Sequence, residues 1–310
     1  MSTPPEADAC HWHPDRPAGV TCQRCDRRIC GLCMHQASVG FHCPSCAGPV
    51  AVGRRRQVHR RHTPAPSSFA HRDPIAIRVV IALNAAAFLY PLSRGASLAE
   101  LLGGGLPDGV DVDFGLIGAG CRQWVIGQCF WWVGVDEGEW WRLVTSAFLH
   151  AGLLHIGFNM FLAWMLGNAL ERLHGPTRFL GLYTGSLAAG SLGVLLMAPT
   201  TFTVGASGAV FGLMGATVVH QYRRGINPWS SGIGTLVVVN LLFTFGRPGI
   251  SIGGHLGGLL GGAALAWLVD TADARGLPRR VGTAMTYAFA LTCFAGGIWA
   301  SANWHDPLLG

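Results

Sequence analysis

The sequence predicts an all-α polytopic membrane protein preceded by a small zinc-binding domain. Three observations lead to this fold class. The 310-residue chain is 50% hydrophobic and only 12% charged, with a mean hydropathy of +0.36, whereas soluble proteins carry about 25% charged residues. Long apolar runs recur from residue 75 onward, as expected for helices that cross a bilayer. Seven of the ten cysteines lie within residues 10–46.

The N-terminal cysteines and one histidine form four pairs, and two residues separate the members of each pair. The pairs are Cys10 and His13, Cys22 and Cys25, Cys30 and Cys33, and Cys43 and Cys46. Each pair can chelate one side of a tetrahedral ion, and two pairs complete a structural zinc site. The eight ligands therefore predict two structural Zn²⁺ ions and resemble a B-box-type zinc finger.

The short gap between Cys25 and Cys30 favours a cross-brace. In that arrangement the first and third pairs share one ion, and the second and fourth pairs share the other. Sequential pairing and a disulfide-stapled module are the alternatives, and His35 and His42 are spare ligand candidates. Because the segment is too short to build a core unaided, we expect bound metal to supply its folding energy.

A linker rich in Arg and Pro is predicted over residues 49–74. Its arginines are Arg54, Arg55, Arg56, Arg60, Arg61 and Arg72. Nucleic-acid binding is one interpretation of such a cluster. An apolar run begins immediately at Ile75, however, so a juxtamembrane basic segment that contacts anionic lipid is favoured and no nucleic-acid partner is expected.

Seven membrane spans are predicted from the apolar runs. They cover residues 75–92, 143–170, 178–198, 205–221, 232–246, 250–269 and 281–301. Arginines cluster on alternate loops, and the long loop 93–142 is rich in acidic residues. The positive-inside rule then places the N-terminus in the cytoplasm, with the acidic loop and the C-terminus outside. Residues 1–50 contain no apolar signal-peptide segment, so we expect the first span to direct insertion.

Two glycine-rich spans carry a candidate nucleophile and a candidate base. Ser207 lies in Gly205-Ala206-Ser207-Gly208 at the start of the fourth span, and His255 lies near the start of the sixth. Both spans begin at the outer face, so both side chains are expected in the same half of the bilayer. A serine hydroxyl needs a neighbouring base, which His255 would supply. A packing role for Ser207 among small residues is the alternative.

The second span supplies further polar residues. His155 and Asn159 are four residues apart and share one helix face. With the Ser207 backbone N–H, they are candidate donors to an oxyanion. His150 precedes His155 by five residues, about 140° round a helix, and need not share the site. Structural hydrogen bonding is the alternative for all three. No His-Glu-x-x-His motif is present, which argues against a metalloprotease.

Taken together, these motifs resemble those of rhomboid intramembrane serine proteases over about residues 75–270. The matching residues are Trp141 and Arg142, His150, His155 and Asn159, Gly205 and Ser207, and His255. The resemblance implies a six-helix core, a Ser207–His255 dyad without a third acidic residue, and no cofactor for catalysis. It also implies a first loop partly in the outer leaflet and substrates that are transmembrane proteins.

Several features depart from the family pattern. Phe211 stands where related proteins often have Tyr, and we expect it to stack on the catalytic imidazole. The first loop is glycine-rich from Gly103 to Gly120, and it holds Cys121 and Cys129, whose pairing the sequence leaves open. Trp141 and Arg142 are expected to be structural and not catalytic, and an interfacial anchor whose Arg reaches toward headgroups is one interpretation.

The predicted organisation is a zinc-binding domain over residues 1–48, the linker over 49–74, a six-helix protease core over 75–280, and a seventh transmembrane helix with a tail over 281–310. The expected location is the cell membrane, with transmembrane substrates and a cytosolic protein partner for the zinc module. A catalytically inactive rhomboid-like protein that binds membrane clients is the alternative function. A transporter is disfavoured by the scarcity of buried charges.

Overall fold

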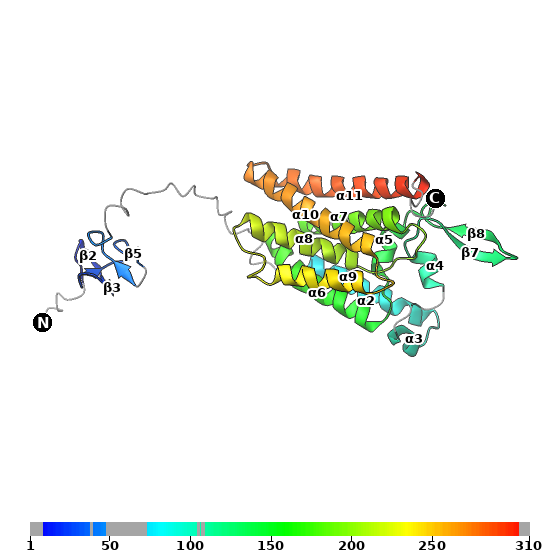
Figure 1. Ribbon diagram of the computed structural model, residues 1–310, viewed down its shortest axis with the longest axis horizontal. Helices are drawn as coiled ribbons and strands as arrows, with labels where there is room; N and C mark the ends of the chain where they lie inside the picture. Colours follow the sequence, from blue (N-terminus) through cyan, green and yellow to red (C-terminus); the bar gives the residue numbers. More distant parts are fainter. Residues whose placement is uncertain (1–8, 38–39, 48–72, 104–105, 107–108, 304–310) are drawn as a thin grey trace. The chain divides into compact units, whose positions relative to one another are not determined.

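The computed structural model describes residues 9–37, 40–47, 73–103, 106 and 109–303, which form two compact units within residues 1–65 and 66–310 (Figure 1). Each unit is described by itself. Apart from residues 73 and 74, the linker predicted over residues 49–74 lies outside the described residues.

The N-terminal unit consists of three small antiparallel hairpin-like sheets. Strand β1 (Ala9–Cys10) pairs with β2 (His13–Pro17), β3 (Val20–Thr21) pairs with β4 (Arg28–Ile29), and β5 (His35–Gln36) pairs with β6 (Phe41–His42). Its buried side chains are mostly cysteines, joined by Ala18 and Ile29. Such a core is too small to stabilise a fold without a further cross-link, as the sequence predicts.

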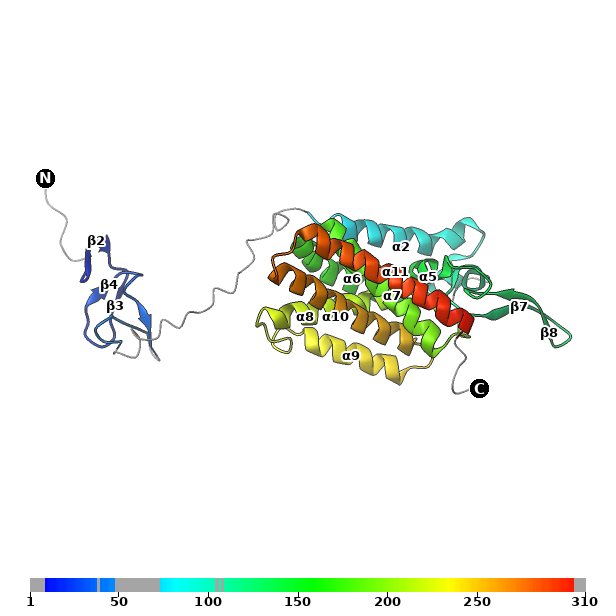
Figure 2. The same cartoon turned by 90° about the horizontal axis from the view of Figure 1, so that it is seen from above.

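The second unit is a bundle of helices whose long members lie side by side in both views (Figures 1 and 2). The long helices are α2 (Ala76–Ser93), α6 (Leu153–His174), α7 (Pro176–Met197), α8 (Ser207–Arg223), α9 (Ile233–Gly246), α10 (Ile252–Ala274) and α11 (Arg279–Asn303). Five of them, α2, α6, α7, α10 and α11, are long and apolar enough to cross a membrane. This is the architecture of a multi-pass membrane protein. Helices α8 and α9 are shorter, at 17 and 14 residues.

Helix α7 is the most buried of the five spanning helices, and it packs against α8, α10 and α11. Glycines allow α8 and α10 to approach each other at backbone distance. A Cβ atom on Gly258 would overlap the backbone of Gly208, and one on Gly262 would overlap the backbone of Gly212. These glycines therefore allow the two helices to pack closely.

A buried carboxylate joins the first two long helices. Glu171 of α6 is only 3% exposed. Its two oxygens accept hydrogen bonds from the backbone N–H groups of Ile75, Ala76 and Ile77, at 2.8, 2.9 and 2.8 Å. These groups have no partner within α2, because the first turn of a helix leaves its N–H groups free, and the negative charge also suits the helix N-terminus. Glu171 thus caps α2 from a neighbouring helix.

The second predicted span is not one continuous helix. Helix α5 (Arg142–Thr145) and the 3₁₀ turn η2 (Ser146–Phe148) come first, and α6 begins only at Leu153. Gly152 precedes α6 with a φ of +87°, a conformation that favours glycine. His150 therefore lies in a connection and not on the helix. The estimate of about 140° between His150 and His155 was wrong, because it assumed a helix through both residues.

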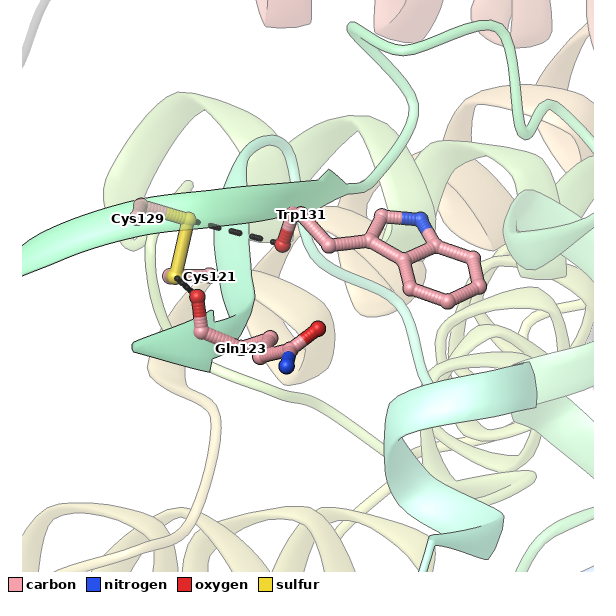
Figure 3. Close-up of a disulfide and its surroundings, with 4 residues drawn as sticks. All are labelled: Cys121, Gln123, Cys129 and Trp131. Atoms are coloured by element: carbon pink, nitrogen blue, oxygen red, sulfur yellow. Dashed lines mark hydrogen bonds between the residues drawn. A yellow bond between two sulfur atoms is a disulfide. The ribbon is translucent and has the colours of Figure 1, made fainter. Parts of the chain in front are cut away.

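The first loop is folded. It contains α3 (Leu98–Leu102), α4 (Val110–Phe114) and a hairpin of β7 (Gly120–Val125) and β8 (Gln128–Val133) that projects beyond the end of the bundle (Figures 1 and 2). A disulfide joins Cys121 to Cys129 across this hairpin (Figure 3), with 5.7 Å between the two Cα atoms. The pairing that the sequence left open is therefore present.

Arg142 holds the first loop against the bundle. Its guanidinium is fully buried and donates to the Glu139 carboxylate at 2.6 Å and to the carbonyls of Gly115 and Val112 at 2.8 and 2.7 Å. The interpretation in which Arg142 reaches toward lipid headgroups was wrong, because loop carbonyls surround the side chain. Trp141 remains half exposed, as an interfacial residue would be.

Replacing Arg142 by Lys is expected to lower the thermal unfolding midpoint of the detergent-solubilised protein. An ammonium group cannot reproduce the fork of donors, so at least one buried carbonyl loses its partner, at a cost of about 1–3 kcal/mol. The exposed Arg94 offers a matched control, since Arg94→Lys should leave the midpoint unchanged. Equal midpoints for both variants would contradict the role assigned to Arg142.

Candidate active site

The turn before α8 sets the position of Ser207. Gly205 has a φ of +120°, and its N–H donates to the carbonyl of Ser146 at 2.9 Å. Upstream, Leu116 and Thr203 exchange backbone hydrogen bonds at 2.9 and 2.8 Å, which tie this turn to the first loop. Ser207 follows as the first residue of α8. Two separate segments thus anchor the chain that leads into Ser207.

His155 points at this turn. A Cβ atom on Gly205 would lie 2.7 Å from His155 Nε2 and 3.7 Å from Ser207 Oγ, so glycine leaves space that the imidazole approaches. The Nδ1 atom of His155 accepts the backbone N–H of Ala151 at 3.2 Å. A neutral imidazole that accepts at Nδ1 carries its proton on Nε2. His155 therefore presents a donor N–H toward the space beside Gly205 and Ser207.

His255 has the opposite arrangement. It packs on Phe211, with ring centroids 4.0 Å apart and planes 18° apart, so the expected stacking is confirmed. Its Nδ1 lies 2.7 Å from Thr244 Oγ1. Thr244 gives its hydroxyl proton to the carbonyl of Asn240 at 2.8 Å, so it accepts from His255. His255 Nδ1 then carries the proton, and Nε2 keeps a free lone pair.

Ser207 and His255 are brought to one side of α8. Phe211 lies one turn after Ser207 and therefore shares its helix face, and the same Phe211 ring contacts His255. Gly208 and Gly254, their chain neighbours, meet backbone to backbone. Among the described residues no hydrogen bond joins Ser207 to His255, a common situation in a site without substrate.

Asn159 and His150 complete the polar surroundings of His155. The Asn159 amide donates to the His155 carbonyl at 3.1 Å, and the side chain is buried. Its second N–H is not used by that bond. The His150 ring stands edge-on to His155 at 5.0 Å between centroids, and its Nδ1 donates to the carbonyl of Phe148 at 3.3 Å. His150, for which the sequence left a place in the site open, lies beside His155.

A small cavity of about 30 Å³ adjoins Ser207. Hydroxyl groups from several segments line it, namely Ser146, Ser191, Thr203, Ser207 and Ser251. A volume of this size has room for a water molecule, and the hydroxyls offer the polar partners that a buried water needs.

The eight predicted metal ligands converge into two groups in the N-terminal unit. Cys10, His13, Cys30 and Cys33 form one, and Cys22, Cys25, Cys43 and Cys46 form the other, with the ligand atoms of each group within 4.8 Å of one another. This is the cross-braced pairing that the sequence favours. His35 and His42 pair with each other across β5 and β6, away from both groups.

The spacing within each group suits a metal ion. Cys10 Sγ and Cys33 Sγ are 3.8 Å apart, and Cys25 Sγ and Cys43 Sγ are 3.6 Å apart. His13 offers Nδ1, at 3.2 to 3.9 Å from the three sulfurs of its group. A tetrahedral zinc with Zn–S bonds of about 2.3 Å holds its sulfurs roughly 3.8 Å apart. Both groups could therefore hold a metal ion.

The thiol groups also favour a cation. Burial alone raises the pKa of Cys10, but hydrogen bonds from the backbone of Cys30 and Trp12 lower it to about 6. Burial together with the neighbouring Cys10 and Cys30 raises the pKa of Cys33 to about 12. Thiolates that stand this close repel one another, and a divalent cation between them removes the repulsion.

Thr244 was missed by the sequence analysis. It lies four residues after Asn240 in a largely apolar span, and it resembles the many threonines that bond their own helix backbone. Its contact with His255 depends on how α9 packs against α10. The available signal was a hydroxyl two residues before the end of the span.

The helical bundle is similar in sequence to known proteins. The family model named Rhomboid domain matches residues 137–271. The chain is 33% identical over 180 residues to Rhomboid protease GluP of Bacillus subtilis, which covers 56% of this chain and 35% of that protein. It is 40% identical over 140 residues to the Putative rhomboid protease YdcA of Bacillus subtilis, covering 44% of this chain and 70% of that protein.

A relative outside the bacteria aligns as well. Rhomboid-like protease 1 of Toxoplasma gondii is 35% identical over 148 residues, covering 44% of this chain and 49% of that protein. The chain thus spans about a third to a half of GluP and of the Toxoplasma relative, and more than two thirds of YdcA. The bundle, its polar centre and these similarities lead to one conclusion: the chain belongs to the rhomboid family.

Proposed function

We propose that this protein is an intramembrane serine endopeptidase that cleaves transmembrane segments of membrane proteins with a Ser207–His255 dyad. The observation that carries the proposal is the opposite hydrogen bonding of two histidines near one serine. His255 keeps a free lone pair at Nε2, as a base needs, while His155 offers an N–H at Nε2, as an oxyanion donor needs. Relatives named as rhomboid proteases support the same activity.

The chemistry proceeds in two halves. His255 Nε2 takes the Ser207 hydroxyl proton as Oγ attacks the scissile carbonyl, and the imidazolium then gives that proton to the leaving amine. The backbone N–H of Ser207, the His155 N–H and the free Asn159 N–H are the proposed oxyanion donors. A water molecule then hydrolyses the acyl-enzyme, and the hydroxyl-lined cavity beside Ser207 is a suitable place to hold it. No metal or organic cofactor is proposed for this reaction.

Several residues support the site without joining the chemistry. Phe211 holds the plane of His255, and Gly205 leaves room for His155. His150 packs against His155, and Arg142 secures the first loop. Both dyad residues are present, which does not favour the alternative of an inactive client-binding protein.

A cleavage assay on a reporter membrane protein tests this function. Wild-type protein reconstituted in liposomes should cut a single-span reporter, and both Ser207→Ala and His255→Ala should leave it intact. Reporter cleavage by both variants at the wild-type rate would refute the dyad.

The N-terminal unit is proposed to bind two structural Zn²⁺ ions and to recruit a cytosolic protein partner. The proposed domain limits are residues 1–48 for this module, 75–280 for the protease core and 281–310 for the last helix and tail. The proposed location is the cell membrane, with the N-terminus in the cytoplasm and the C-terminus outside, which keeps the thiols reduced and the Cys121–Cys129 disulfide in an oxidising space.

The zinc content of the purified protein tests the two proposed metal sites. The purified full-length protein should contain two zinc ions per chain, and Cys22→Ser should reduce this to about one, because it removes a thiolate from one group only. Cys293→Ser, which changes a buried cysteine in α11, should leave two ions bound. A stoichiometry near zero in the wild type would overturn the assignment.

A further inference from the structure

We propose that Thr244 orients the catalytic base, so that the proposed dyad works with a third, uncharged member supplied by α9. The inference rests on the proposed function, because it assigns a role relative to Ser207 and His255. Thr244 is a positioning residue here, because its proposed role acts through the hydrogen bond to His255. The sequence predicts a dyad without a third acidic group, and a hydroxyl takes that place in the structure.

The direction of the hydrogen bond follows from the proton count. Thr244 Oγ1 has one proton, and the carbonyl of Asn240 at 2.8 Å can only accept it. While Asn240 takes that proton, Thr244 accepts a hydrogen bond from His255 Nδ1, at 2.7 Å. The imidazole is left with its proton on Nδ1 and its lone pair on Nε2. This is the tautomer that can take a proton from a serine.

Stacking on Phe211 does not by itself select this state. The contact fixes the plane of the His255 ring, with an interplanar angle of 18°. A rotation of 180° about χ2 keeps the ring in the same plane and exchanges the position of Nδ1 with that of Cδ2. The hydrogen bond to Thr244 distinguishes the two orientations, because only one of them places Nδ1 against Oγ1. Phe211 and Thr244 together fix both the plane and the edge.

Thr244 differs from threonines whose hydroxyl bonds only the backbone of its own helix. Thr217 of α8 and Thr292 of α11 also donate to the carbonyl four residues earlier, at 2.7 and 3.0 Å, and the structure gives their hydroxyls no imidazole partner. Thr244 is 2% exposed, although α9 has only one other buried residue, Ile233 at its opposite end. Helix α9 thus directs a single buried hydroxyl at the site.

The bond should matter most in the transition state. As His255 Nε2 takes the Ser207 proton, the ring becomes a cation and the Nδ1–H bond to Thr244 becomes charge-assisted, about twice as strong as a neutral bond. The Thr244 proton stays on Oγ1 throughout. Because the gain appears only when the proton moves, losing it should lower kcat and leave KM nearly unchanged.

Steady-state cleavage of a single-span reporter in liposomes tests whether kcat falls while KM stays unchanged. Thr244→Val, which keeps the shape and removes the hydroxyl, should lower kcat about 10- to 100-fold with KM within about 2-fold. Thr244→Ser restores the hydroxyl and should recover kcat to within about 3-fold of the wild type. Thr217→Val removes a hydroxyl that bonds only its own helix, and it should behave as wild type.

A second measurement needs no change at Thr244. In protein with ¹⁵N-labelled histidine, the His255 resonances, assigned by their loss in His255→Ala, should show a protonated Nδ1 and an unprotonated Nε2 at neutral pH. The opposite tautomer in the wild type would overturn the proposal even if Thr244→Val fails to fold.

The outcomes also separate this inference from the proposed function. If Thr244→Val retains wild-type kcat while Ser207→Ala is inactive, the role of Thr244 is refuted and the protease function stands. If Ser207→Ala cleaves as well as wild type, both are refuted. A kcat loss in Thr244→Val that Thr244→Ser does not reverse would mean that the methyl packing of Thr244 matters and not its hydroxyl, which contradicts the proposal.

Discussion

Replacing Ser207 by Ala is expected to reduce cleavage of a transmembrane reporter by at least about 10⁴-fold, because the change removes the oxygen that is proposed to form the acyl-enzyme. The change removes one oxygen at the first residue of α8 and leaves the turn that Gly205 makes with Ser146 intact. Folding should therefore be unaffected, and the unfolding midpoint of the variant in detergent should match the wild type.

Ser186→Ala is the matched control for this prediction. Ser186 is a buried serine in α7 whose hydroxyl donates to the carbonyl of Leu182 at 2.7 Å. The substitution removes the same atom from the same bundle, and activity should stay within about 3-fold of the wild type. Comparable cleavage by Ser207→Ala and Ser186→Ala would contradict the assignment of the nucleophile.

Replacing Gly262 by Ala is the second change with a large expected effect. The added methyl group would overlap the backbone O, C and Cα atoms of Gly212, which cannot move aside as a side chain can. Overpacking of this kind costs about 3 kcal/mol, at the upper end of the usual range. Separation of α8 from α10 also moves Ser207 away from His255, and a shift of about 1 Å in a reacting group can cost about 100-fold in rate.

Gly157→Ala separates this packing effect from helix propensity. Gly157 lies in α6 with no atom within 4 Å of the position that its Cβ would occupy. Alanine should therefore be tolerated and slightly stabilising there, by up to about 1 kcal/mol. Thermal unfolding in detergent and reporter cleavage should both fall for Gly262→Ala and neither for Gly157→Ala. A Gly262→Ala protein as stable and as active as wild type would show that α8 and α10 do not pack in this way.

Local chemistry was enough to predict much of this structure. Metal chelation depends on short spacings, so the pairs that begin at Cys10 and Cys22 could be recognised, and the short gap between Cys25 and Cys30 favoured the cross-brace that the structure adopts. Apolar run length located the long helices, and the glycine-rich runs marked two helices that the structure packs closely together. Each of these features depends on residues that lie close together in the sequence.

Features that depend on tertiary contacts could not be predicted in this way. The sequence gives no strong sign of the break before α6, because residues 149–152 are themselves mostly apolar or small. His150 was therefore placed on a helix. The partners of Arg142 could not be named, since the carbonyls that surround it come from about 30 residues earlier in the chain. Thr244 meets His255 only because α9 packs against α10.

Covalent labelling with a fluorophosphonate tests the central claim most directly, since it requires an activated serine and no knowledge of the natural substrate. The reagent loses fluoride as serine Oγ bonds to phosphorus, and peptide mass spectrometry locates the adduct. The expected result is a single adduct on Ser207 in the wild type, with His255→Ala labelled at least about 100-fold more slowly. An adduct on another residue, or equal labelling of Ser207 in the wild type and in His255→Ala, would contradict the Ser207–His255 dyad.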